Sequence, residues 1–136
     1  MILEVNDTKT IEDIRKEFSD YYPFLRIEFY DEPHKYGEAS SDKHLLPHNK
    51  AINEIRKRHE CGMLEIYSWH KTGTVEQEFK RLYGLNVQIF RRQGDRWIQT
   101  AGTDELSLEE QNEIAYNATQ EILHGRDNRI EREKPL

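Results

Sequence analysis

The sequence has a single cysteine, Cys61, so no disulfide can form within the chain. A chain without a disulfide framework is typical of a reducing compartment. The first ten residues, MILEVNDTKT, have neither the basic start nor the long apolar run of a signal peptide. No window approaches the ~20 consecutive apolar residues that a membrane-spanning helix needs. These absences predict a cytoplasmic protein with no membrane partner.

The motifs of common cofactor and metal sites are also missing. The phosphate-binding patterns GxGxxG and GKS/T do not occur, and neither do HExxH or CxxC. His44 and His48 have the spacing of helical metal ligands, but Pro47 between them is incompatible with one regular helix face. Cys61 could act as a nucleophile with His59, His44 or His48 as its base, yet a lone Cys next to Gly is more typical of a small buried side chain. We therefore expect no metal, no cofactor and no catalytic residue, and leave enzymatic activity open while favouring none.

Basic residues are scarce and unevenly placed. The chain has 20 basic and 26 acidic residues, which gives a net charge of −6. This balance argues against nucleic acid as the main partner, because such binding depends on neutralising phosphates. No Lys or Arg lies between Trp97 and Gly125, whereas arginines are concentrated just before this stretch. The separation indicates either ordinary solvated faces or an association between surfaces of opposite charge.

Residues 1–61 and 62–122 resemble two copies of one unit. At an offset of 61, the matched pairs are Leu3 with Leu64, Ile14 with Val75, Glu17 with Glu78, Phe18 with Phe79, and Tyr22 with Tyr83. At an offset of 60, Leu25, Ile27 and Phe29 match Leu85, Val87 and Ile89. The matches follow the apolar pattern, so they predict a shared architecture and say nothing of a reaction. We expect one domain over residues 1–124, made of these two repeats, and a flexible charged tail over residues 125–136.

The periodicity predicts the same order of elements in each copy. In the first, we expect a strand at 2–5, a helix capped by Thr8 or Thr10 that ends before Pro23, a strand at 24–30, a polar loop at 31–47 and a helix at 49–60. In the second, we expect a strand at 63–69, a helix at 74–83 with a Thr74–Gln77 capping box, and a hairpin over 85–100. A last helix would open at the Ser107–Glu110 capping box, carry Leu108, Ala115, Ala118 and Ile122 on its apolar stripe, and end at Gly125. The prediction is an α+β fold of duplicated βαβ(β)α units, with helices packed on a mainly antiparallel sheet, or on two small sheets.

Three blocks of the sequence resemble a group of small bacterial proteins that have no established function. The blocks are YYPFLRIEFY, HKYGEAS and YGLNVQIFRRQGDRWIQTAGTDELSLEEQNE. The group reads FPFLKIEFF, HKxGEGS and FGLxVQVFRKSGxxWLxTxxTDxWTLEEQN, in the same order. The sequence departs from it at Ala39, where the group tends to have Gly, and at Glu105-Leu106, where it tends to have an aromatic. The resemblance covers most of the chain to about Glu113 and implies a bacterial origin and a common fold, but no activity.

Our leading hypothesis is a non-catalytic binding or protein-interaction module that contacts an unknown protein or a second copy of itself. Its candidate interaction surface comprises Arg91, Arg92, Arg96, Glu109 and Glu113.

One alternative is a small ligand-binding protein or enzyme that uses the polar loop 31–48, with Asp31, His34, Glu38 and His44 as candidate ligand-binding residues. The other is nucleic-acid contact through the hairpin at 91–96, where guanidinium groups lie beside Trp97.

Overall fold

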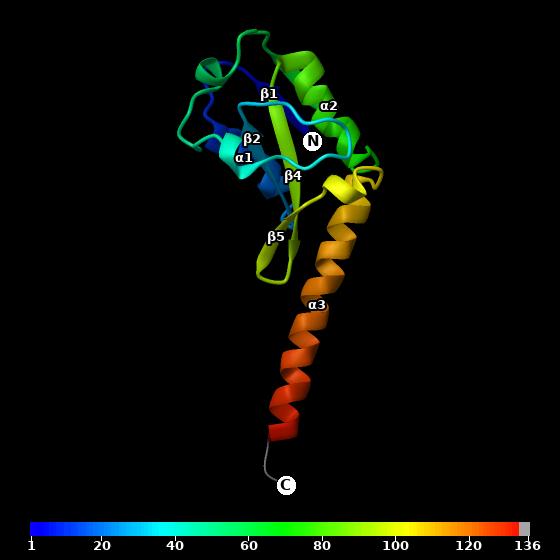
Figure 1. The fold of residues 1–136 in the computed structure, drawn as a ribbon. Helices are drawn as coiled ribbons and strands as arrows, with labels where there is room; N and C mark the ends of the chain where they lie inside the picture. The colour runs from blue at the N-terminus through cyan, green and yellow to red at the C-terminus, as the bar shows by residue number, and fades with distance from the viewer. Residues whose placement is uncertain (134–136) are drawn as a thin grey trace.

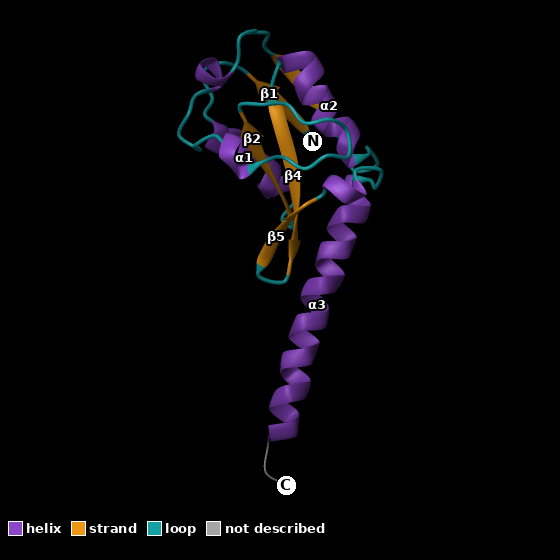
Figure 2. Cartoon of the chain, in the orientation of Figure 1, coloured by secondary structure: helices purple, strands orange, loops and turns teal. Residues whose placement is uncertain are grey.

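Helices and antiparallel strands alternate along the chain (Figure 1; Figure 2). The computed structural model describes residues 1–133, and the side chains of residues 1–121. The elements are β1 (Ile2–Val5), α1 (Ile11–Tyr21), β2 (Leu25–Tyr30), β3 (Gly62–Glu65), α2 (Thr72–Tyr83), β4 (Asn86–Gln93), β5 (Arg96–Gln99) and α3 (Leu108–Glu133), with short 3₁₀ helices at Asp42–His44, Ile52–Ile55 and Ala101–Thr103. The predicted α+β class is confirmed.

The strands form two antiparallel sheets. One consists of β1 and β3, and the other has the order β2-β4-β5. The sequence was compatible with one sheet or two, because alternation shows which residues face the core and not which strands pair. α3 packs against β4 and then projects beyond the rest of the molecule, as the orange and red segment in Figure 1. No helix in the described part of the chain is long and apolar enough to cross a membrane.

A single apolar core joins both sheets and the two shorter helices. In β2, alternate residues Leu25, Ile27 and Phe29 are fully buried, as the alternation predicts. In α1, the buried residues Ile11, Ile14 and Phe18 recur at helical spacing and face the same core. The predicted pattern of apolar positions is therefore the pattern that the fold buries.

Two of the helices begin at a side-chain cap, and the third begins at backbone acceptors from a distant segment. α1 begins with a capping box in which Thr10 accepts from the Asp13 amide and Asp13 accepts from the Thr10 amide. The predicted capping box at Ser107 and Glu110 also forms. The predicted start of α2 at Thr74 is wrong: the helix begins at Thr72, and the amides of its first turn donate to the carbonyl oxygens of Leu106 and Asp104. The backbone of another segment supplies the acceptors that a side-chain cap would otherwise provide.

Three further element predictions are wrong. Residues 49–60 do not form the expected helix and contain only the 3₁₀ turn Ile52–Ile55. The amide of Ile11 donates to the Lys50 carbonyl and that of Ile52 to the Lys9 carbonyl, so this segment pairs with the start of α1 instead of bonding to itself. The strand expected at 63–69 ends at Glu65, and α3 continues past Gly125 to Glu133. Ile122, predicted on the inner stripe of that helix, lies outside the residues whose side chains are described.

Some backbone contacts join matched positions of the two halves, and others are similar within each half. The β1–β3 pairing includes Leu3 opposite Leu64, and the β2–β4 pairing includes Glu28 opposite Gln88, which are matched positions in each case. The isolated bridge from Thr10 to Ala51 has a counterpart from Lys71 to Ser107. These are the contacts that a two-fold relation between the halves would require. The internal duplication itself stays a prediction.

Candidate functional site

The polar loop after β2 passes over β4 in Figure 1 and is held at the free edge of this strand by side chains. The Tyr36 hydroxyl donates to the Asp104 carbonyl oxygen over 3.1 Å, and the Gly37 amide donates to Asp104 Oδ2 over 2.8 Å. Ser40 exchanges two hydrogen bonds with the Gln99 side chain, each 2.8 Å long. A segment without regular secondary structure thus has a defined path over β4 and the start of α2.

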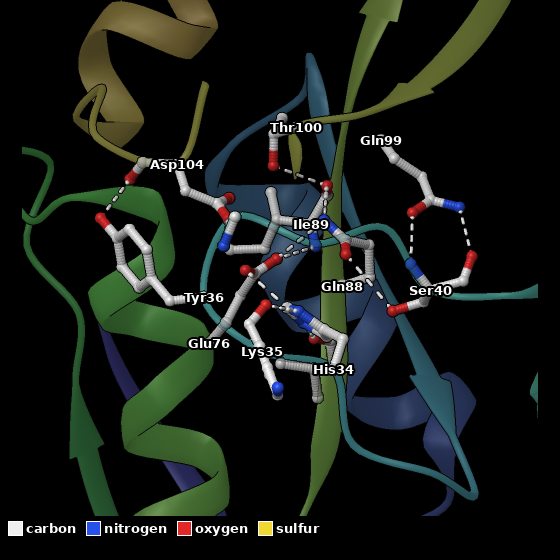
Figure 3. A network of polar contacts seen from close by, with 12 residues as sticks. His34, Lys35, Tyr36, Ser40, Glu76, Gln88, Ile89, Gln99, Thr100 and Asp104 are labelled. Atoms are coloured by element: carbon white, nitrogen blue, oxygen red, sulfur yellow. Dashed lines mark hydrogen bonds and ion pairs between the residues drawn. The ribbon is translucent and has the colours of Figure 1, made fainter. Parts of the chain in front are cut away.

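Beneath this loop, the edge of β4 is open. β5 pairs only with the stretch from Phe90 to Gln93, so residues 87–89 have no neighbouring strand on that side. Side chains complete the hydrogen bonds: Glu76 Oε2 accepts from the Ile89 amide at 2.7 Å, and His34 Nε2 lies 2.9 Å from the Val87 carbonyl oxygen. The Thr100 hydroxyl donates to the Ile89 carbonyl oxygen at 2.8 Å (Figure 3). The departure of β5 therefore creates a polar site at the free edge of β4.

Glu76 is the central residue of this site. It comes from α2, is 4% exposed, and lies within the first turns of the helix. Burial raises the pKa of its carboxyl group to about 9, although the hydrogen bond from Ile89 opposes the rise and nearby Asp104 adds to it. At neutral pH the group is therefore an uncharged carboxylic acid.

The position of the proton on Glu76 follows from its contacts. Oε2 accepts from both the Ile89 amide and Gln88 Nε2, the latter at 3.0 Å. Oε1 is buried and has no hydrogen-bond partner among the described residues. Since two donors already point at Oε2, the proton resides on Oε1 and leaves it as an unused O–H donor.

Glu28 is a second buried carboxylate, and its contacts differ from those of Glu76. It is 3% exposed and binds Arg15 Nη2 at 2.9 Å and His48 Nε2 at 2.8 Å. Basic side chains therefore contact both of its oxygens. Glu76 has no such partner within hydrogen-bond distance in the described residues, because the nearest basic nitrogen, His34 Nε2, is 3.7 Å from Oε1. Burial without a close basic partner distinguishes Glu76 from a structural ion pair.

His34 closes the site from the loop. Its Nδ1 lies 2.8 Å from the Lys35 carbonyl oxygen, and its Nε2 faces the Val87 carbonyl oxygen. Both carbonyl oxygens can only accept, so a ring nitrogen that carries hydrogen donates to the carbonyl oxygen that it faces. The ring thus fastens the loop to the edge of β4 and forms one wall of the space above Glu76 (Figure 3).

These residues enclose a cavity of about 270 Å³. Its wall is formed by the loop residues His34, Lys35 and Tyr36 on one side and by Glu76 and Gln77 of α2 on the other. Carboxylic acid, phenol, amide and ammonium groups all meet in this space. The arrangement can hold a small polar molecule, and the free O–H of Glu76 can donate to an acceptor on it.

The structure brings together only part of the predicted loop site. His34 lines the cavity, whereas Asp31 and His44 contact each other at 2.9 Å away from it, and Glu38 is exposed. In the predicted interaction surface, Arg91 is partly buried and donates to Gln111 Oε1 at 2.9 Å, which ties β4 to α3. The remaining members, Arg92, Arg96, Glu109 and Glu113, are exposed.

Glu76, the central residue of the site, was not singled out from the sequence. A signal was present: Glu76 precedes Phe79 by three residues and Tyr83 by seven, a spacing that places all three on one face of a helix. Phe79 and Tyr83 are both buried, so a carboxylate on their face is an anomaly in an amphipathic helix. A charged residue at a predicted core position is a useful indicator of a site.

The described residues contain no group of three His, Cys, Asp or Glu side chains that could hold a metal ion. Cys61 is exposed, so the expectation of a small buried side chain is wrong. Its sulfur contacts the backbone carbonyl of His59 at 3.5 Å, and the His59 ring instead contacts Asp7. The geometry pairs His59 with a carboxylate and not with the thiol.

No protein-family model, curated protein or solved structure matched this chain. The resemblance of its three sequence blocks to a group of small bacterial proteins stays a prediction.

Gly73→Ala is expected to release the loop that covers the cavity. A Cβ atom at Gly73 would lie 2.6 Å from Cζ of Tyr36 and would overlap the ring, so the ring must move and its hydrogen bond to Asp104 is lost. We expect the Gly37 amide, which donates to Asp104, to exchange with solvent about tenfold faster in hydrogen-exchange NMR. Gly102→Ala is the matched control, because nothing lies within 4 Å of the Cβ position there. Equal protection of Gly37 in both variants would contradict this packing.

Proposed function

We propose that the protein is a non-catalytic binding protein and that a small molecule occupies the cavity between His34 and Glu76. The observation that carries this proposal is the buried Oε1 of Glu76, which has no hydrogen-bond partner among the described residues. Because burial raises the pKa of this carboxyl group, the unused atom is a donor in search of an acceptor. An unmade hydrogen bond of a buried polar group costs about 1–3 kcal/mol. A ligand with a carbonyl oxygen or an aromatic nitrogen would supply the missing acceptor.

The composition of the cavity wall supports binding and not catalysis. Its described residues include no Ser, Thr or Cys beside His34, so a nucleophile with an adjacent base is absent from them. Both ring nitrogens of His34 already face backbone carbonyl oxygens. We expect this binding protein to act in a bacterial cytoplasm, on the grounds of the single cysteine and the sequence blocks described above.

A blocked cavity tests the proposal. Gln77 is exposed and lies at the cavity wall, so Gln77→Trp should fill the space without disturbing the core. The probes are small neutral acceptors, namely acetamide, pyridine and nicotinamide, titrated into ¹⁵N-labelled protein. We expect at least one of them to shift the Ile89 amide signal saturably, since this amide donates to Glu76. Binding should weaken at least about tenfold in Gln77→Trp.

The control is Gln93→Trp, which places the same ring at an exposed position of the β4–β5 hairpin. It should bind the probe as the wild type does. The proposal is wrong if no probe shifts Ile89, or if Gln77→Trp and Gln93→Trp bind equally well.

A further inference from the structure

The cavity at Glu76 continues into two neighbouring hollows on the surface. The second hollow, of about 620 Å³, shares Gln77, Lys80 and Asn86 with the cavity. The third, of about 560 Å³, shares Arg58, Gly84 and Asn86 with the second. The three therefore adjoin one another around Asn86, at the start of β4, and are called the groove below, with the Glu76 cavity at one end.

Lysines without ion-pair partners line this groove. Lys35 and Lys80 lie at the cavity, and Lys50 and Lys57 line the third hollow. All four are exposed, and none forms an ion pair with another described residue, whereas Lys9 and Lys71 on other surfaces do. The groove thus concentrates positive charge on a chain whose net charge is −6.

Besides Glu76, the acidic side chains that line the groove are Asp31 and Glu54, and both already contact other groups of the protein. Asp31 contacts His44, and Glu54 Oε2 accepts from the Ala51 amide at 3.1 Å. The three arginines that line the groove are also committed. Arg58 donates to carbonyl oxygens at the end of α2, Arg56 pairs with Asp7, and Arg81 pairs with Glu78. The ammonium groups of the lysines remain as the groups able to bind an added anion.

We propose that the ligand of the Glu76 cavity is a small organic anion with a neutral, hydrogen-bond-accepting end. The neutral end accepts from Glu76 Oε1, and a phosphate or carboxylate group at the other end lies in the groove against Lys80. This inference builds on the proposed function. The two ends cannot exchange places, because burying an anion beside the uncharged, desolvated Glu76 would be costly, whereas the groove is open to water.

The groove favours a small molecule over a nucleic acid. Tyr36 is the one Phe, Tyr or Trp among the described residues that line the three hollows, so successive bases would find no row of large rings on which to stack. The net charge of −6 also opposes a long polyanion, whose many phosphates extend beyond the four lysines.

Two anions serve as probes of the groove: inorganic pyrophosphate and citrate, each titrated at constant ionic strength into ¹⁵N-labelled full-length protein. We expect saturable shifts of the Gly84 and Asn86 amide signals. Lys80→Gln should weaken binding about tenfold, and Lys16→Gln, which removes an exposed and unpaired lysine of α1, should leave it unchanged. Tighter binding of pyrophosphate identifies phosphate as the preferred group, and tighter binding of citrate identifies carboxylate.

Shifts that do not saturate, or equal weakening in Lys80→Gln and Lys16→Gln, would overturn the assignment of an anionic ligand. The outcome is separable from that of the cavity experiment. If neutral probes bind at Ile89 and the anions do not bind, the cavity function stands and the anionic end is wrong. If the anions bind at Lys80 and no neutral probe reaches Ile89, the proposed cavity function is wrong, and with it the two-ended ligand.

Discussion

Replacing Glu76 by Gln is expected to remove a large part of the pH dependence of stability at neutral pH. In the folded protein, burial raises the pKa of Glu76 to about 9, above the usual value of 4.5. Between these two values the folded state holds a proton that the unfolded state has lost, so stability falls as pH rises. The contribution is fully present below about pH 4.5 and is lost through about pH 9.

The expected effect of Glu76 on the pH dependence of the free energy of unfolding is large. Each pH unit in this window lowers the free energy of unfolding by about 1.4 kcal/mol. From about pH 6 to about pH 8 the wild type should therefore lose roughly 3 kcal/mol more than Glu76→Gln, as measured by urea denaturation. Gln can accept from the Ile89 amide as Glu76 does, and it carries no titrating proton.

The matched control is Glu4→Gln, which changes an exposed carboxylate on β1. This variant should keep the pH dependence of the wild type. Parallel stability curves for the wild type and Glu76→Gln would contradict a neutral Glu76.

Phe79→Ala is expected to lower the free energy of unfolding by about 3–5 kcal/mol. Phe79 is fully buried, and its ring packs edge-to-face on Phe29 with 6.4 Å between centroids. The contact joins α2 to β2, which belong to different halves of the chain. Truncation leaves a cavity at this junction that the surrounding strands can close only in part.

Phe18→Ala should cost a similar amount, because Phe18 is also fully buried and stands 61 residues before Phe79. Tyr21→Ala, at a ring that is 58% exposed, should change stability by less than about 1 kcal/mol. Losses at Phe18 and Phe79 that differ by more than about 2 kcal/mol would argue against equivalent positions and so against the predicted duplication.

The parts of the fold that the sequence predicts are those governed by local periodicity. The alternation of Leu25, Ile27 and Phe29 and the stripe from Ile11 to Phe18 identify β2 and α1, because each pattern reports one buried face. The helix expected at 49–60 fails for the opposite reason: its backbone bonds to Lys9 and Ile11, some forty residues away. The helix propensity of residues 49–60 carries no information about pairing with residues far away in the sequence.

The candidate site could likewise be predicted only in part from the sequence. The length and polarity of the loop after β2 identify it as a candidate, and His34 does belong to the cavity. The importance of Glu76 depends on where β5 leaves β4, which exposes the Ile89 amide that Glu76 then binds. The position at which β5 leaves β4 follows from strand pairing, and no motif near Glu76 in the sequence indicates it.

Direct titration of Glu76 tests the central claim, namely that a neutral carboxylic acid offers its proton to a ligand in the cavity. The ¹³C chemical shift of its side-chain carboxyl carbon can be followed by NMR in protein labelled at glutamate and assigned with Glu76→Gln. The account predicts a titration midpoint near the pKa of about 9. A midpoint near the ordinary pKa of 4.5 would mean that Glu76 is charged at neutral pH and would contradict the account.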